Sequence, residues 1–189
     1  MTFKTLSTAL VSALALSGVL AASSHAQSAN PMVGGAAMFP DRTIVENAVN
    51  SADHTTLVAA VKAAGLVDTL SSDGPFTVFA PTNAAFDRIS DESLNALLQP
   101  EAKAQLTQIL TCHVVSANAM SDAIAGMIAD DGGMHAVPTV GGCTLQAEMD
   151  GDQITLTDEN GREATVTIAD VRQSNGVIHV IDRVLLPAQ

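Results

Sequence analysis

The chain has 189 residues, of which 20 are acidic and 8 basic, and its net charge at pH 7 is −12. An acidic chain without a cluster of Lys or Arg repels phosphate backbones and anionic lipid, so binding of nucleic acid is not expected. The chain has no Trp and no Tyr, which leaves few aromatic rings on which a sugar or a base could stack.

The first 26 residues have the pattern of a signal peptide. Lys4 precedes an apolar run over residues 6–20, and Ser24-His25-Ala26 offers a cleavage site. The run is too short and too rich in Ala and Ser for a membrane span. We therefore predict a secreted or periplasmic protein that is cleaved near Ala26 and is not inserted in a membrane.

A single domain is predicted over residues 40–187, a size at which one hydrophobic core is expected. Residues 27–39 precede it; they are small, Gly-rich and without periodicity, and predict a flexible lead-in. The first half of the domain is helical by pattern, because apolar residues recur every three to four positions within 44–64 and 94–110. A short strand, Phe76–Ala80, is predicted between these two stretches.

The second half of the domain alternates apolar and polar residues. Alternation over Cys143–Met149 predicts a half-buried strand, and the hairpin signals Asp150-Gly151 and Asn160-Gly161 separate it from two further strands. One more helix is predicted around residues 122–129, and a last strand over Val177–Leu186. Helices followed by an antiparallel meander predict an α+β fold.

The two cysteines, Cys112 and Cys143, both follow the signal peptide. In an oxidising compartment an even number of cysteines predicts a disulfide. A catalytic thiol would need His113 or His179 as its partner, but Cys143 falls on the apolar face of its strand, which suits a buried bridge. Both histidines are predicted to be hydrogen-bonded in the interior. No signature of a hydrolase or a phosphate-binding loop occurs, so we predict no enzyme and no catalytic residue.

Two groups of residues contain side chains that could bind a metal. Cys112, His113, His135 and Cys143 are the ligand types of zinc, but neighbours along an extended segment point to opposite sides. The acidic pair Asp130-Asp131 precedes two glycines and predicts a mobile loop that reaches His135, with a cation or partner contact as the alternative. We predict no metal and no cofactor.

Two segments carry a resemblance to a known family. Residues 74–86 read Gly-Pro-Phe-Thr-Val-Phe-Ala-Pro-Thr-Asn-Ala-Ala-Phe, and residues 174–187 combine a Ser-Asn-Gly turn with a strand pattern. Both resemble the signature motifs of the fasciclin domain family, in order and in separation. The resemblance spans residues 41–187 and implies a fold in which N-terminal helices pack on an antiparallel β wedge or sandwich.

The resemblance also implies a function. Members of the family are mostly extracellular adhesion or matrix modules, and many bacterial members are small single-domain secreted proteins. A Tyr-His pair implicated in cell contact corresponds to Cys112 and His113 here, so that Cys replaces Tyr. An Asp-Ile pair linked to integrin binding in animal members corresponds to Asp170 and Val171.

We therefore predict a non-catalytic secreted or periplasmic module for cell adhesion or protein–protein interaction. Its partner is expected to be a protein or a component of a cell surface or matrix, and its contact region to include His113, Asp170 and Val171. The alternative is a soluble periplasmic protein that binds a small molecule or a cation.

Overall fold

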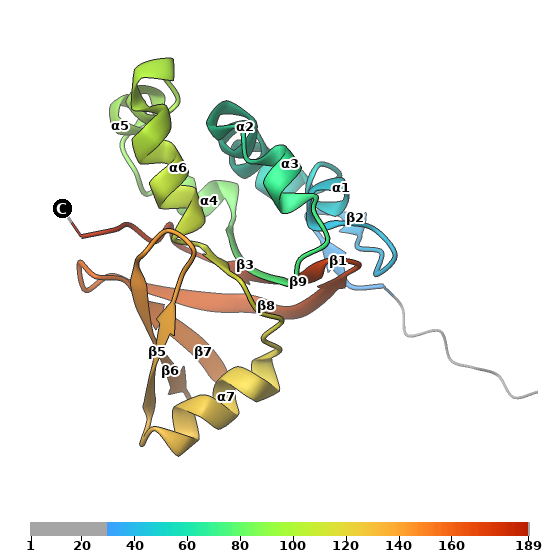
Figure 1. The fold of residues 1–189 in the computed structure, drawn as a ribbon, viewed down its shortest axis with the longest axis vertical. Coiled ribbons are helices and arrows are strands. Elements are labelled where there is room, and N and C mark those ends of the chain that lie inside the picture. The colour runs from blue at the N-terminus through green and yellow to red at the C-terminus, as the bar shows by residue number, and fades with distance from the viewer. Residues whose placement is uncertain (1–29, 189) are drawn as a thin grey trace, which may run out of the picture.

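A computed structural model describes residues 30–188 of the chain (Figure 1). Its elements in chain order are β1 (Met32–Val33), β2 (Ala36–Ala37), α1 (Ile44–Ala48), η1 (Ala52–His54), α2 (Thr55–Ala64), α3 (Val67–Leu70), β3 (Phe76–Pro81), α4 (Asn83–Phe86), α5 (Asp91–Leu97), η2 (Pro100–Ala102), α6 (Lys103–Thr111), β4 (Val114–Val115), α7 (Ser121–Asp130), β5 (Met134–Pro138), β6 (Thr144–Asp150), β7 (Gln153–Thr157), β8 (Glu163–Gln173) and β9 (Gly176–Ile181). No helix within the described residues combines the length and the apolar character that a membrane span requires.

Seven strands form one sheet in the order β4-β3-β9-β8-β7-β6-β5, and β1 pairs with β2 in a separate hairpin. All neighbouring strands in the sheet are antiparallel except β3 and β9, which are parallel. Helices followed by a mostly antiparallel sheet confirm the predicted α+β class.

The parallel pair of β3 and β9 lies inside the sheet. Six successive residue pairs join the strands, from Phe76 with Gly176 to Pro81 with Ile181. Every residue of β9 is buried, which matches the nearly continuous apolar run expected of a parallel strand covered on both faces. A Cβ atom at Gly176 would overlap the carbonyl oxygen of Phe76, so the two backbones approach this closely only because position 176 has no side chain.

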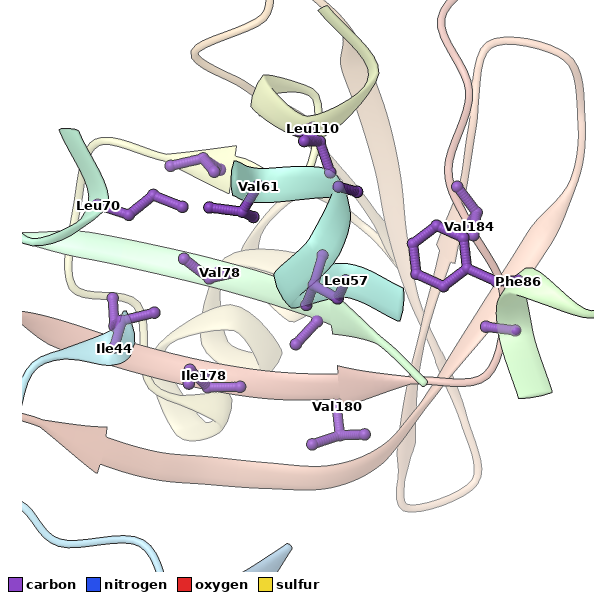
Figure 2. Packing of buried hydrophobic residues seen from close by; sticks show 14 of the residues in the cluster. Ile44, Leu57, Val61, Leu70, Val78, Phe86, Leu110, Ile178, Val180 and Val184 are labelled. Atoms are coloured by element: carbon purple, nitrogen blue, oxygen red, sulfur yellow. The ribbon is translucent and has the colours of Figure 1, made fainter. Parts of the chain in front are cut away.

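Helices cover the sheet on two sides (Figure 1). Helices α1 to α6 lie on one side, and α7 lies on the other. Leu57 and Val61 of α2 point toward Val78, Ile178 and Val180 of the central strands in Figure 2, and all five side chains are at least nine-tenths buried. Burial of each such side chain contributes about 1.5–3 kcal/mol, so this cluster is a main source of stability.

A second core lies between α7 and the opposite face of the sheet. Ile124 and Ile128 of α7 pack with Leu145, Leu156 and Phe79, and each is at most 2% exposed. Phe79 and Val78 are neighbours in β3 but belong to different cores, because successive side chains of a strand point to opposite faces.

The disulfide between Cys112 and Cys143 is formed, with Cα atoms 5.4 Å apart. This confirms the predicted pairing. Cys112 follows α6 and Cys143 precedes β6, so the bridge ties the helical layer to the β5–β6 hairpin, and both residues are buried.

The lead-in differs from the flexible segment that was predicted for residues 27–39. From residue 30 on it is ordered: Met38 and Val33 are 2% and 4% exposed and join the first core. The Met38 amide donates to the Pro31 carbonyl at 2.9 Å, and the Ala52 amide donates to the Gly34 carbonyl at 3.1 Å. The glycines that suggested flexibility instead allow the positive φ angles of the β1–β2 turn. The predicted signal peptide lies outside the described residues.

Two further expectations differ from the structure. The segment after α7 is not a mobile loop, because the Gly133 amide donates to the Ile128 carbonyl at 2.8 Å and β5 begins at the next residue. The last strand ends at Ile181 rather than Leu186. There the Thr165 amide donates to the Asp182 carboxylate at 2.8 Å while the Asp182 amide donates to the Thr165 carbonyl at 3.2 Å, so a side chain replaces one of the two backbone acceptors.

Replacing Gly176 with Ala should lower the free energy of unfolding by at least about 2 kcal/mol, because the new Cβ pushes β9 away from β3. Gly126→Ala is the matched control, since position 126 is helical with nothing within 4 Å of a new Cβ, and it should raise stability by about 0.5–1 kcal/mol. Urea unfolding followed by far-UV circular dichroism measures both. Equal stability changes in the two variants would contradict the close approach of β3 and β9.

Candidate functional site

His113, the first of the predicted contact residues, is buried just after α6 and is 2% exposed. The Leu185 amide donates to its Nε2 at 2.9 Å, so Nδ1 carries the proton and donates to the Ile109 carbonyl at 2.8 Å. The neutral ring thereby links α6 to the segment after β9. The prediction of a hydrogen-bonded interior histidine is confirmed.

Asp170 lies in an irregular part of β8, within the shift of the β8–β9 register between Ile168 and Val171. Its φ of 59° is the only positive φ of a non-glycine residue among residues 30–188. This geometry turns the carboxylate toward α7, where it accepts the Ser121 amide at 2.7 Å and the Ser121 hydroxyl. Because the first amides of a helix have no partner within the helix, Asp170 acts as a cap that comes from a distant strand.

The other predicted contact residue, Val171, is fully buried in the first core and pairs with Ile178 of β9. No hydrogen bond joins His113 to Asp170 within the described part of the chain. The contact region that the resemblance implied therefore consists of side chains that hold elements together, and any surface they serve must be formed by neighbouring residues.

One exposed loop leads into α7, the helix that Asp170 caps. Residues 116–118, between β4 and α7, are exposed. Thr77 donates its hydroxyl to the Ala117 carbonyl at 2.6 Å and accepts the Ala119 amide at 2.8 Å. His179, which is fully buried, donates Nε2–H to the Ala119 carbonyl at 2.8 Å. The loop is thus fixed from behind by β3 and β9 while its front stays open to solvent.

His179 and Asp170 act on this loop together. The Asp170 amide donates to Nδ1 of His179 at 3.3 Å, which leaves the proton of the neutral ring on Nε2 for Ala119. The imidazole ring also stacks on Phe79, with ring centroids 5.7 Å apart. The prediction that His179 is an interior, hydrogen-bonded histidine is confirmed.

Burial controls the ionisation of these histidines. It lowers the pKa of His113 to about 4, although the Ile109 carbonyl and the Asp158 carboxylate favour the charged ring. Burial also lowers the pKa of His179, against the opposing influence of Ala119 and Asp170. Both rings are neutral at pH 7, so neither presents a positive charge to a partner.

The residues considered for a metal do not converge. Within residues 30–188 no group of three or more His, Cys, Asp or Glu side chains is close enough to hold an ion. Cys112 and Cys143 are bonded to each other and offer no thiolate. His135 pairs only with Asp131, at 2.6 Å between Nδ1 and the carboxylate, which gives two ligands where a cation site needs more.

Two buried polar side chains, Asp158 and Asn175, each bond several backbone groups, and the sequence patterns did not predict either role. Asp158, read only as part of a turn, has a side chain with no exposed surface, and it accepts the amides of Asn160, Arg162 and Leu186 at 2.9–3.0 Å. Asn160 donates to the carbonyls of Leu186 and Pro187. The β7–β8 turn therefore holds the C-terminal segment in place. The sequence Asp-Glu-Asn-Gly over residues 158–161 is the one local signal of such a turn.

Asn175 is the second polar side chain that bonds several backbone groups. Its Oδ1 accepts the Ile44 amide at 3.0 Å, and its amide group donates to the carbonyls of Leu70 and Ser72 at 2.9 and 2.8 Å. One side chain in the β8–β9 turn thus connects α1 with the end of α3, which a turn signal alone does not reveal.

Comparison with known proteins decides the family. The sequence profile of the fasciclin domain matches residues 52–187. This chain belongs to the fasciclin domain family. Protein sll1483 of Synechocystis sp. is 42% identical over 179 residues, which span 93% of this fasciclin domain protein and 90% of that relative.

Other relatives are longer or more distant. Transforming growth factor-beta-induced protein ig-h3 of Oryctolagus cuniculus is 39% identical over 133 residues, which cover 70% of this chain but 17% of that protein. A solved FAS1 domain pair from the insect cell adhesion molecule fasciclin I superposes with a TM-score of 0.69 at 19% identity, covering 78% of this chain and 51% of that one. The structural likeness confirms the fasciclin fold.

The free energy of unfolding should fall as the pH drops from about 6.5, where an unfolded imidazole titrates, to about 4. The sign follows because the unfolded chain binds a proton that the folded chain excludes from His113. By about pH 5 this one group should cost about 2 kcal/mol. His113→Gln keeps an acceptor and a donor but does not titrate, so it should lose about 2 kcal/mol less than the parent between about pH 7.5 and pH 5. Parallel urea titrations test this, and equal losses would contradict it.

Replacing both Cys112 and Cys143 with Ala should lower the free energy of unfolding by about 3–4 kcal/mol, because the bridge closes a loop with a sequence separation of 31. Chemical unfolding of the oxidised protein, the reduced protein and the double variant measures this. Reduction should affect the parent and leave the variant unchanged. A parent that is indifferent to reduction, and whose mass shows blocked free thiols before reduction, would contradict the bridge.

Proposed function

We propose that this fasciclin domain is a non-catalytic module that leaves the cytoplasm and acts through protein–protein contact in cell adhesion. The observation that carries the proposal is the loop over residues 116–118, which is exposed in front and anchored behind by Thr77, while His179 and Asp170 hold Ala119 and Ser121 just after it. A recognition surface that is already fixed loses little conformational entropy on binding. The likeness to a domain pair from an insect cell adhesion molecule supports the same reading.

The side chains with catalytic potential are used for structure. Both ring nitrogens of His113 and of His179 form hydrogen bonds with backbone groups. The two cysteines are bonded to each other. A general base or nucleophile must instead be free to reach a substrate. The disulfide also supports export, because such bridges persist in oxidising compartments.

A cavity between α2 and the sheet is one place where the alternative, a binder of small molecules, could hold a ligand. The cavity is lined almost wholly by apolar side chains and has a volume of about 60 Å³. Ligand pockets measure about 300–1,000 Å³, and even an engineered cavity that takes up benzene is about 150 Å³. The size of this cavity favours a packing void over a ligand site.

The double substitution Ser116→Arg with Asn118→Arg should reduce binding to cell surfaces at least about tenfold, because bulky charged side chains block the anchored loop. The measurement is flow cytometry of the labelled mature protein on cells of the producing organism that lack the gene. Thr144→Arg with Gln153→Arg, two exposed positions on β6 and β7, adds the same charge elsewhere and should bind like the parent.

Thermal unfolding of both double variants should match that of the parent, which separates lost contact from lost folding. If the variant at Ser116 and Asn118 binds as the parent does, the loop is not the contact surface and the proposal fails. If the parent itself does not bind to such cells, the adhesion role fails.

A further inference from the structure

Basic side chains are scarce in this chain, and three of them gather in one place. Of the eight Lys and Arg residues, Lys4 alone precedes the described part. Three of the others, Arg88, Arg162 and Arg183, line two adjoining hollows beside the C-terminal segment. In a chain with a net charge of −12, such a cluster makes the local potential less negative than that of the surrounding surface.

The larger hollow is a groove of about 790 Å³ between the α5–α6 pair and residues 186–188. The smaller one, about 360 Å³, shares Arg88, Ile89, Arg162 and Leu186 with it. The two therefore form one continuous depression, here called the arginine groove. Among residues 30–188 no Asp or Glu lines it, so each charged side chain in its wall is positive.

The arginines are held in place yet keep donors to spare. Arg88 pairs with Asp182 through one nitrogen, with Nη2 3.3 Å from the carboxylate. Arg162 Nε lies 3.2 Å from a carboxylate oxygen of the fully buried Asp158, an ion pair without the geometry of a hydrogen bond. Since a guanidinium group has five N–H donors, most of them remain for a ligand on the groove side.

Arg183 adds a third guanidinium group, which lines the smaller hollow. Its Nε is buried without a hydrogen-bond partner. A buried donor without an acceptor is unfavourable, and hydrogen bonds to charged groups are among the strongest in proteins. Because Nε itself is enclosed, a carboxylate seated in the smaller hollow would pair with the terminal nitrogens of the Arg88 and Arg183 guanidinium groups.

The remainder of the groove suits a peptide chain. Ile89, Leu97 and Leu186 provide apolar contact surface, and the exposed amides of Gln105 and Gln108 can pair with a peptide backbone. An acidic polysaccharide has little apolar surface with which to cover these three apolar side chains. Apolar surface beside arginines therefore favours a peptide with alternating apolar and acidic residues.

We propose that the arginine groove binds an extended acidic segment of a partner protein. Arg88, Arg162 and Arg183 pair with its carboxylates, and the surface around Leu97 receives an apolar side chain. This inference rests on the proposed function as a contact module, but it names a different surface from the loop over residues 116–118.

The probe is a fluorescein-labelled peptide of alternating Glu and Leu residues, titrated with the mature protein and followed by fluorescence polarisation at low salt. Arg88→Gln should weaken binding about tenfold, the effect expected from loss of one charge-assisted pair. Its ion pair with Asp182 is exposed, so the protein should still fold. Arg172→Gln is the matched control, because Arg172 is exposed on β8 outside the groove, and its affinity should stay within about twofold of the parent.

Further outcomes separate the possible explanations. A peptide with Gln in place of Glu should not bind, and amide shifts on peptide addition should centre on α5, α6 and the C-terminal segment. Equal weakening by Arg88→Gln and Arg172→Gln, or binding of heparin in place of the peptide, would overturn the proposal. The Ser116→Arg and Asn118→Arg variant should bind the peptide normally, so failure of the groove and failure of the loop give distinct results.

Discussion

The parallel pairing of β3 with β9 is the contact on which the remainder of the fasciclin domain depends. Six residue pairs connect segments that lie about a hundred positions apart in the chain, so closing this contact carries the largest loop entropy of any strand pairing in the described sheet. Burial of apolar side chains on both faces of the pair offsets this cost. Helix α2 covers one side of the pair, and the second core with α7 covers the other. The two signature segments seen in the sequence are these two strands with their turns. Few other residues fit there, because β3 and β9 approach closely at Gly176 and the Asn175 side chain bonds backbone groups of two helical segments.

Periodicity predicted most of the elements, since alternation and helical spacing record which side chains are buried. The α+β class, the disulfide and the interior positions of His113 and His179 are confirmed. The parallel pairing and the edge strand β5 could not be predicted. The first depends on partners that are distant in the chain, and the second is five residues long and mostly exposed or half-buried. The β1–β2 hairpin was missed because Gly-Gly is common to flexible segments and to tight turns.

Two features, the role of Asp170 and the arginine groove, could not be predicted from the sequence. Asp170 stood out through family resemblance, but its role as the cap of α7 depends on a positive φ and on Ser121, 49 residues away. The arginine groove was not visible in the sequence, because Arg88, Arg162 and Arg183 are far apart and form no charge run. In both places the chemistry arises from folding, which brings together residues that carry no local signal.

The N-terminal hairpin changes what should be regarded as the structural unit. The family profile begins at residue 52, but Val33 and Met38 occupy core space ahead of it. A fragment cut at the profile boundary would lose α1 as well, and with it the Ile44 amide that Asn175 accepts. Excision along family boundaries would thus leave an open, partly apolar flank on the helical side. In longer proteins built from such domains, the linker ahead of each profile should be counted as part of the domain it precedes.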